Sequence, residues 1–166
     1  DKLIIYDHQK AGTDVPFLGE RFAKACKIVD AVILFPMSGP VTEKEWMLSC
    51  KKEGLKVIVG GEMTHQGYLS SDDGFIIDDA PRRIYTIAKE LGVNDFVVPG
   101  NKPESIKSYR KLLGDEAVFY SPGLITQGGS LSESGKVAGK HWHAFVGRAL
   151  YKAKDIRQKA EELCKL

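Results

Sequence analysis

Short runs of β-branched and aromatic residues alternate along this chain with longer amphipathic segments. Such alternation is typical of repeated strand–helix units built around a parallel sheet. The six predicted strands are nearly continuous in apolar residues, as strands buried on both faces are. They span Leu3–His8, Ala31–Pro36, Lys56–Glu62, Asp95–Pro99, Ala117–Ser121 and His143–Val146.

The segments between the strands predict five helices, with Pro103 at a helix start and Gly54, Gly92 and Gly114 at helix ends, where these residue types are favoured. The segment Gly128–Lys140 is rich in Gly and Ser and predicts a loop with at most a short helix. No linker divides the chain, so we expect a single domain over residues 1–166. The predicted helices span Phe17–Val29, Thr42–Lys52, Ala80–Leu91, Pro103–Leu113 and Ala149–Cys164.

The composition fits one globular domain, with 166 residues of which 43% are hydrophobic and 28% charged. No apolar run approaches the ~18 residues that a membrane span needs, and the N-terminus lacks the layout of a signal peptide. The net charge of +2 favours neither a nucleic-acid partner nor a membrane partner. Cys26, Cys50 and Cys164 lie far apart, which predicts reduced thiols and no metal site. We therefore expect a cytoplasmic protein.

The densest group of ionisable residues directly follows the first predicted strand. Lys10 stands between Asp7 and Asp14, and opposite charges nearby keep a lysine protonated. Such a lysine can act as a general acid beside an anionic centre. The alternative is a solvated turn with surface ion pairs. His8 in the same segment is a candidate base or ligand, or a structural hydrogen-bonding residue.

A second polar cluster, Glu62–Gly67, follows the third predicted strand. The hydroxyl of Thr64 and the imidazole of His65 could bind a polar ligand there, although an ordinary loop between strand and helix explains the same residues. Gly60 and Gly61 do not form a dinucleotide-binding fingerprint, because no G-x-G-x-x-G pattern follows a strand in this sequence.

The third cluster follows the last two predicted strands and gives the strongest signal for a ligand. The first part, Ser121–Ser130, contains glycines whose backbone N–H groups can approach an anion. The second part, Val146–Arg148, brings an arginine that can bind phosphate oxygens in a bidentate manner, at the start of a predicted helix. A purely structural Gly-rich loop is the alternative.

The position of this third cluster helps to choose between two folds. Six strand–helix units fit a doubly wound open sheet, or part of an eight-stranded barrel. In (β/α)₈ barrels the phosphate site is commonly built by the loops after the last two strands. We therefore expect an α/β fold of the (β/α)₈ TIM-barrel type, represented from about its third strand onward with the first two βα units absent. A first residue Asp1 in place of methionine agrees with a fragment.

These clusters resemble the motifs of the orotidine 5′-phosphate decarboxylase family. Ser121-Pro122-Gly123 followed by Gln127-Gly128-Gly129, and Val146-Gly147-Arg148-Ala149-Leu150-Tyr151, are similar to its phosphate-binding loops. The segment Glu62–Gly67 is similar to its fifth-strand motif, and Asp7, Lys10 and Asp14 to its Asp-Lys-Asp array. The resemblance implies a usually dimeric barrel that converts orotidine monophosphate to uridine monophosphate and CO₂ in pyrimidine synthesis.

The resemblance also implies roles for individual residues. Lys10 would be the proton donor, Asp7 would lie beside the leaving carboxylate, and Asp14 would act in the neighbouring subunit of a homodimer. Thr64 would contact the pyrimidine. No cofactor and no metal would be required. The residues expected to bind the phosphate end of the substrate are Pro122, Gly123, Gln127, Gly128, Gly147 and Arg148.

This sequence departs from the family pattern at two positions. The family array is Asp-x-Lys-x-x-Asp, whereas both gaps between Asp7, Lys10 and Asp14 are one residue longer here. Gln66 stands where many relatives have proline. The family's first two strands supply a substrate-contacting aspartate and a lysine, to which no residue of this chain is assigned.

Two other functions fit the same residues. A related barrel decarboxylase of sugar phosphates would share the charged array and the phosphate site, but it would need a divalent metal. A barrel that binds phosphate ligands without catalysis would keep the anion-binding loop and lose the role of Lys10.

Overall fold

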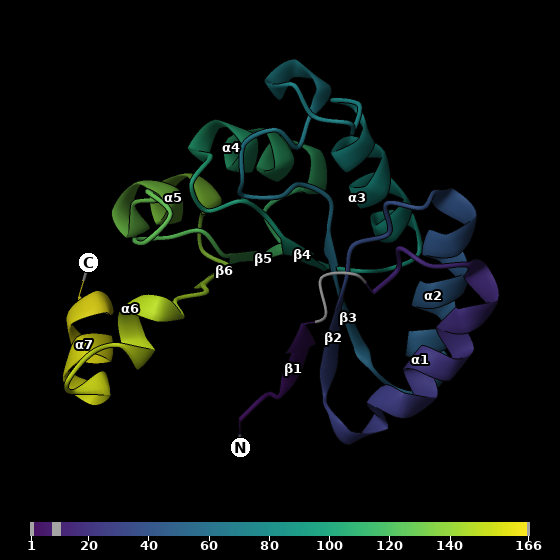
Figure 1. Cartoon of the computed structure of the whole chain (residues 1–166), viewed down its shortest axis with the longest axis horizontal. Coiled ribbons are helices and arrows are strands. Elements are labelled where there is room, and N and C mark those ends of the chain that lie inside the picture. The colour runs from purple at the N-terminus through teal and green to yellow at the C-terminus, as the bar shows by residue number, and fades with distance from the viewer. Residues whose placement is uncertain (1, 8–10, 166) are drawn as a thin grey trace. The chain divides into compact units, whose positions relative to one another are not determined.

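The structure is a computed structural model that describes residues 2–7 and 11–165, with six strands that alternate with helices (Figure 1). The chain divides into two compact units, residues 1–97 and residues 98–166. The expected single domain therefore stays a prediction. No helix within the described residues is both long enough and apolar enough to cross a membrane.

The first unit contains four parallel strands that follow one another in chain order. Asp7 pairs with Ile33, and Leu34 pairs with Val59, so neighbouring strands end at the same edge of the sheet. The strand order within this unit does not reverse. A doubly wound sheet, in contrast, reverses its strand order at the switch point. The strands lie inside their predicted ranges and are shorter, with bounds β1 (Ile5–Asp7), β2 (Ala31–Leu34), β3 (Lys56–Gly60) and β4 (Asp95–Val97).

Three helices form a layer against these strands, because α1 packs on α2, α2 packs on α3, and both α2 and α3 contact β3 (Figure 1). Their bounds are α1 (Gly19–Ala25), α2 (Pro40–Lys52) and α3 (Ala80–Glu90). The predicted helix Phe17–Val29 is shorter than expected, since 3₁₀ turns flank α1 at Pro16–Leu18 and Cys26–Ile28. Such turns are frequent at helix ends.

The core of the first unit lies between β2, β3 and this helix layer. All four residues of β2 are buried. The Tyr85 hydroxyl on α3 donates to the carbonyl oxygen of Val97 at 2.8 Å and accepts from the N–H of Gly61 at 3.1 Å. A Cβ on Gly60 would lie 2.2 Å from the ring of the buried Phe35, so a larger residue there would force this ring to shift. The layer is thereby fixed to the ends of β3 and β4.

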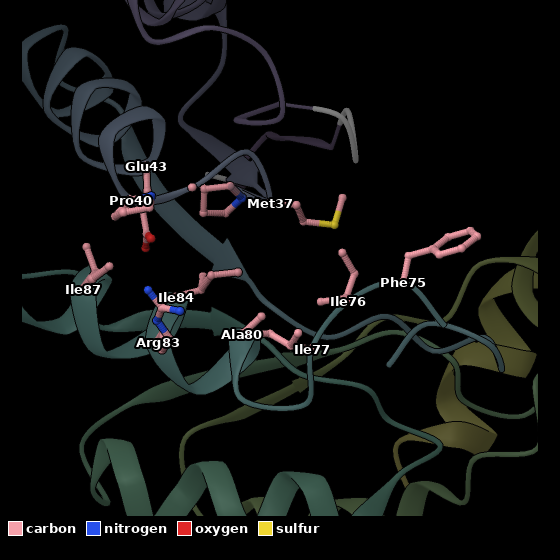
Figure 2. A pocket seen from close by; sticks show the side chains of 12 residues that line it. Met37, Pro40, Glu43, Phe75, Ile76, Ile77, Ala80, Arg83, Ile84 and Ile87 are labelled. Carbon is pink, nitrogen blue, oxygen red and sulfur yellow. The ribbon is translucent and has the colours of Figure 1, made fainter. Parts of the chain in front are cut away.

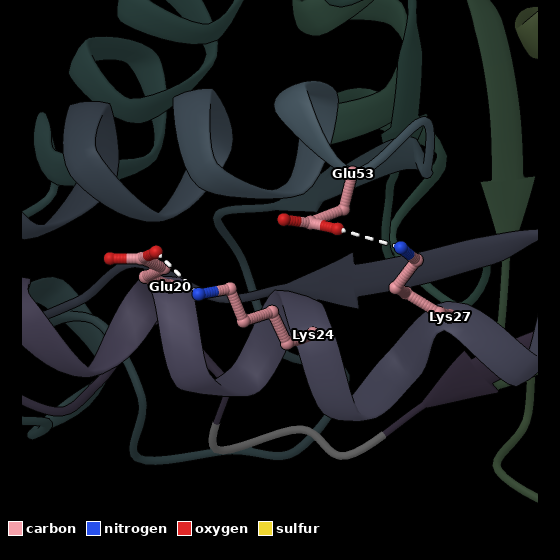
Figure 3. A network of polar contacts seen from close by, with 4 residues as sticks. All are labelled: Glu20, Lys24, Lys27 and Glu53. Atoms are coloured by element: carbon pink, nitrogen blue, oxygen red, sulfur yellow. Dashed lines mark hydrogen bonds and ion pairs between the residues drawn. The ribbon is translucent and has the colours of Figure 1, made fainter.

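Two ion pairs lie on this helix layer, one between the 3₁₀ turn after α1 and the residue after α2, and one within α1 (Figure 3). Lys27 lies 3.1 Å from the carboxylate of Glu53, and Lys24 lies 2.7 Å from Glu20 one turn earlier. The hydrogen bond and the charge of Lys24 lower the pKa of the Glu20 carboxyl. Ion pairs at the surface contribute little to stability, so the apolar layer beneath them carries it.

The second unit contains two parallel strands, β5 (Val118–Ser121) and β6 (Trp142–Ala144). Helix α4 (Pro103–Leu113) has the predicted bounds. Helix α5 (Leu131–Ala138) is the short helix within the segment predicted as a loop, and the Ser130 hydroxyl caps it by accepting from the N–H of Glu133 at 3.3 Å.

Arg110 ties the elements of the second unit together. Its guanidinium donates to the carbonyl oxygens of Gly114, at 2.8 Å, and Ala117, at 2.7 Å, and also to that of Ala138 at the end of α5. The same group lies 3.9 Å from the centre of the Phe119 ring. Burial lowers the pKa of the Arg110 guanidinium. This arginine therefore has a structural role.

The predicted helix Ala149–Cys164 is wrong as one continuous helix. It is two helices, α6 (Arg148–Tyr151) and α7 (Ile156–Leu163). The break has a local cause, because the Asp155 carboxylate accepts from the N–H of Gln158 at 2.9 Å and starts α7 as its N-cap. The three cysteines are free thiols, and Cys26 and Cys50 are buried.

Candidate active site

In the first unit, three predicted site residues follow neighbouring parallel strands. Asp7 is the last residue of β1, and its side chain is exposed. Asp14 follows β1, and Thr64 follows β3. Because β1, β2 and β3 run in parallel, these residues lie at the carboxyl edge of one sheet, where parallel α/β folds keep their sites.

The segment that carries Asp14 is held by backbone contacts to β2 and α2. The N–H of Phe35 donates to the carbonyl oxygen of Ala11 at 2.8 Å, and the Thr42 hydroxyl donates to that of Asp14 at 3.2 Å. Gly12 has φ of +85°, and a Cβ there would lie 3.2 Å from the Cα of Pro36. A close approach of two backbones thus requires glycine at this position.

The carboxylate of Asp14 is exposed and accepts from the N–H of Val15 at 2.7 Å. Its backbone is therefore anchored while the charged group faces solvent. Lys10 and His8 lie outside the described residues, so their predicted roles stay predictions.

The loop that carries Thr64 is closed by two hydrogen bonds. The Tyr68 hydroxyl donates to the carbonyl oxygen of Gly61 at 2.9 Å, and the N–H of Gly67 donates to the carboxylate of Asp72 at 2.7 Å. Burial, assisted by the charge of Glu62, raises the pKa of Tyr68 to about 12, so its hydroxyl stays a donor. Thr64 itself is half-buried within this loop.

In the second unit, the Gly-rich loop after β5 folds back on itself. The N–H of Ile125 donates to Gly129 at 2.8 Å, and the N–H of Gly129 donates to Gly123 at 3.2 Å. The N–H of Gly128 donates to Ile125 at 3.2 Å, so it is bonded inside the loop. The side chain of Gln127 is exposed at the tip. Thr126 beside it is exposed as well, so the loop carries two neighbouring polar side chains at the surface.

Glycine is required where this loop packs on its neighbour. A Cβ on Gly129 would lie 2.8 Å from the carbonyl oxygens of Gly100 and Gly123. The Ser134 hydroxyl on α5 holds the same carbonyl of Gly100 at 2.5 Å. Some of the glycines in this loop are therefore required for packing. This agrees in part with the alternative interpretation, a Gly-rich loop with a structural role.

Arg148 follows the neighbouring strand β6. The N–H of Phe145 donates to the carbonyl oxygen of Ser121 at 2.9 Å, which brings the chain after β6 beside the end of β5. Gly147 precedes α6, and Arg148 is its exposed first residue. The expected long helix dipole at Arg148 is wrong, since α6 has four residues and one turn carries a small dipole.

The structure thus brings the predicted residues together in two sets, each within its own unit. Asp7, Asp14 and Thr64 follow strands of the first unit, whereas the Gln127 loop and Arg148 follow the paired strands of the second. Within residues 2–7 and 11–165, no group of three or more His, Cys, Asp or Glu side chains is placed to hold a metal ion.

One buried acid was not among the predicted site residues. Glu43 on α2 is 1% exposed, and a cavity opens beside it. Its spacing from Trp46, Met47 and Cys50 places it on the buried face of the helix, and that spacing was readable in the sequence.

Known proteins of similar sequence include several orotidine 5′-phosphate decarboxylases. Orotidine 5′-phosphate decarboxylase of Methanosarcina mazei is 34% identical over 134 residues, which cover 81% of this chain and 58% of that protein. The enzyme of the same name from Methanocaldococcus jannaschii is 27% identical over 163 residues, which cover 98% of this chain and 72% of that protein. The chain thus spans less than two thirds of the length of the Methanosarcina mazei relative. No family profile matches the sequence.

Solved structures agree with the sequence relatives. The crystal structure of orotidine 5′-monophosphate decarboxylase from Methanocaldococcus jannaschii with the inhibitor BMP superposes with a TM-score of 0.84 at 27% identity. The match covers 99% of this chain and 73% of that chain. The predicted family resemblance and the predicted barrel fold class are both confirmed.

Proposed function

We propose that this chain, a homologue of orotidine 5′-phosphate decarboxylases, is a decarboxylase that converts orotidine monophosphate to uridine monophosphate and CO₂. The observation that carries the proposal is the superposition of nearly the whole chain on an orotidine 5′-monophosphate decarboxylase at 27% identity. Homology at this level, with the charged array and the phosphate-loop motifs retained in the sequence, supports the same reaction.

The reaction breaks the bond between C6 of the pyrimidine and its carboxylate carbon. CO₂ leaves, and the electron pair stays on C6 as a carbanion that needs a nearby cation and then a proton. Lys10 is the proposed donor, since its ammonium can stabilise the carbanion and then protonate C6. Asp7 would lie beside the leaving carboxylate, and Asp14 would act from the partner subunit.

The substrate would be held at its two ends. Thr64 would contact the pyrimidine through its hydroxyl. Arg148 would pair with the phosphate dianion, where a bidentate charge-assisted contact gives both affinity and orientation. Binding energy from this remote phosphate is available to assist the chemistry at C6. The other residues proposed for the phosphate end are Pro122, Gly123, Gln127, Gly128 and Gly147.

Several properties in this proposal are inferred from the family resemblance alone. These are the lysine proton donor, independence from cofactors and metals, a place in pyrimidine synthesis, a homodimeric assembly and a cytoplasmic location.

The test is the formation of uridine monophosphate from orotidine monophosphate by the purified chain, in reactions with and without a chelator. Chromatography measures the product. We expect product formation that the chelator leaves unchanged. Loss of activity with the chelator would contradict the proposed independence from metals. Absence of both product formation and uridine monophosphate binding would favour the metal-dependent sugar-phosphate decarboxylases instead. Binding of uridine monophosphate without turnover would show a barrel that binds phosphate ligands without catalysis.

A further inference from the structure

The first unit contains a second candidate ligand site. A cavity of about 280 Å³ lies between the start of α2, the segment 75–77 and α3 (Figure 2). Of the proposed catalytic and substrate-binding residues that the structure describes, none lines it. Its lining is mostly apolar and includes Pro36, Met37, Pro40, Ile76, Ile84 and Ile87.

Among the described residues, two charged side chains line this cavity, and they stand on opposite walls. Glu43 comes from α2 and Arg83 from α3. Their charged ends point toward one another across the cavity (Figure 2).

Glu43 is an acid in an apolar setting. Its side chain is 1% exposed, and within the described part of the chain its Oε1 has no hydrogen-bond partner. Burial raises the pKa of the Glu43 carboxyl to about 8, which the neighbouring Lys44 only partly offsets. At neutral pH the group is a protonated acid, whose O–H is a donor. A buried donor without an acceptor is destabilising, and a suitable ligand would supply the missing acceptor.

Arg83 supplies the opposite kind of group. It is exposed at the cavity and forms no ion pair with any residue that the structure describes. Its neighbour Arg82 differs, because it lies 3.8 Å from the carboxylate of Asp79. Arg83 is a long and exposed side chain that can turn toward a ligand or away from it.

We propose that this cavity binds a small organic carboxylate with an apolar body, with Arg83 pairing with the anionic head and the Glu43 carboxyl donating a hydrogen bond to it. The apolar lining takes the hydrocarbon part. Arg83 disfavours an ammonium ligand by charge repulsion, since it is the cation that the described residues place on the cavity wall. A neutral amide satisfies the hydrogen bond but forms no ion pair.

Three probes with similar apolar bodies and different heads test the head-group preference: phenylacetate, phenylacetamide and phenethylamine. Binding is followed by NMR on the isotope-labelled full chain, with shifts expected at residues of α2 and α3. We expect phenylacetate to bind with a Kd on the order of 1 mM or tighter, as a ligand of this size allows, and at least about tenfold tighter than the other two. Absence of phenylacetate binding, or a preference for phenethylamine, overturns the proposal.

Variants of exposed arginines test the role of Arg83. Arg83→Ala should lower the affinity for phenylacetate at least about tenfold, because the variant loses a charge-assisted pair. Arg82→Ala is the matched control, because it removes the same charge from the adjacent position and should leave the affinity unchanged. Equal losses in the two variants would mean nonspecific attraction to positive charge and would overturn the site.

Glu43→Gln tests the donor role of the acid. The amide keeps a donor at the same place, so phenylacetate binding should persist at neutral pH. In the wild type, binding should weaken about tenfold between about pH 7 and about pH 9, as Glu43 ionises, while the Gln variant should stay constant. Among the described residues, Arg83 is the other charged group that lines the cavity. Loss of binding in the Gln variant, or equal pH profiles, contradicts the proposal.

Discussion

The indole Nε1 of Trp46 on α2 donates a hydrogen bond of 3.1 Å to the backbone carbonyl oxygen of Val15. This contact, with the Thr42 hydroxyl on the carbonyl of Asp14, fixes the segment after β1 to the helix layer. The exposed carboxylate of Asp14 is thereby carried on a backbone that α2 holds in place.

Trp46→Phe should therefore lower the free energy of unfolding by ~1–2 kcal/mol, because it keeps an aromatic ring but leaves the carbonyl of Val15 without this partner. Urea denaturation measures the change. An unaltered midpoint would mean that the contact contributes nothing to the fold.

Tyr85→Phe should cost ~1–3 kcal/mol of stability. The hydroxyl is fully buried and serves two backbone groups, the carbonyl of Val97 and the N–H of Gly61, and both would lose a partner. Tyr151→Phe is the matched control, since Tyr151 is largely exposed and should tolerate the change. Equal effects of the two variants on thermal unfolding would contradict this account.

Glu43 should make the protein less stable as the pH rises. Its pKa is about 8 when folded against an ordinary value of 4.5, so between these values the folded state binds the proton and the unfolded state has lost it. The stabilising contribution of the protonated acid is complete below pH 4.5 and is lost as the pH rises toward 8.

The Glu43→Gln variant should lack this pH dependence and gain ~1–3 kcal/mol relative to wild type across that range. Glu45→Gln changes an exposed acid of the same helix and should retain the wild-type profile. Denaturation at several pH values measures the difference, and parallel profiles for all three proteins would show that burial of Glu43 has no energetic consequence.

Arg148→Ala should weaken the binding of uridine monophosphate by ~2–4 kcal/mol, because the substitution removes a charge-assisted bidentate contact to the phosphate. Uridine, which has no phosphate, should bind equally to both proteins. Arg157→Ala serves as a control, because Arg157 is exposed and pairs with Glu161 on α7 at 3.1 Å. Equal losses for uridine and its monophosphate in calorimetry would refute the role of Arg148.

The strands and most helices could be predicted because local signals and burial agree. Apolar runs predicted all six strands, and Pro103 with Gly114 marked both ends of α4. The split between α6 and α7 was missed because helix-type residues continue through it, although Asp155 is a recognisable cap. Local sequence therefore predicts the presence of strands and helices well, and the interruptions between helices less well.

The candidate site could be predicted as far as it depends on strand ends. Polar residues after parallel strands share an edge, so Asp7 and Thr64 could be grouped from the sequence. Glu43 was missed because an acid in a helix is ordinarily exposed, and its burial follows from how α2 packs against α3. Which N–H groups of the Gly-rich loop are already bonded, such as that of Gly128, also depends on tertiary structure.

The most direct test of the proposed decarboxylase is the rate of uridine monophosphate formation by the wild-type chain and by Lys10→Ala, with product binding measured on the same samples. The variant should be slower by at least ~10³-fold, because one ammonium both stabilises the carbanion and protonates it. Product binding should persist, since Arg148 and Thr64 are unchanged. A Lys10→Ala protein that keeps more than about a tenth of the wild-type rate would contradict the account, because a general acid supplies ~10²-fold or more.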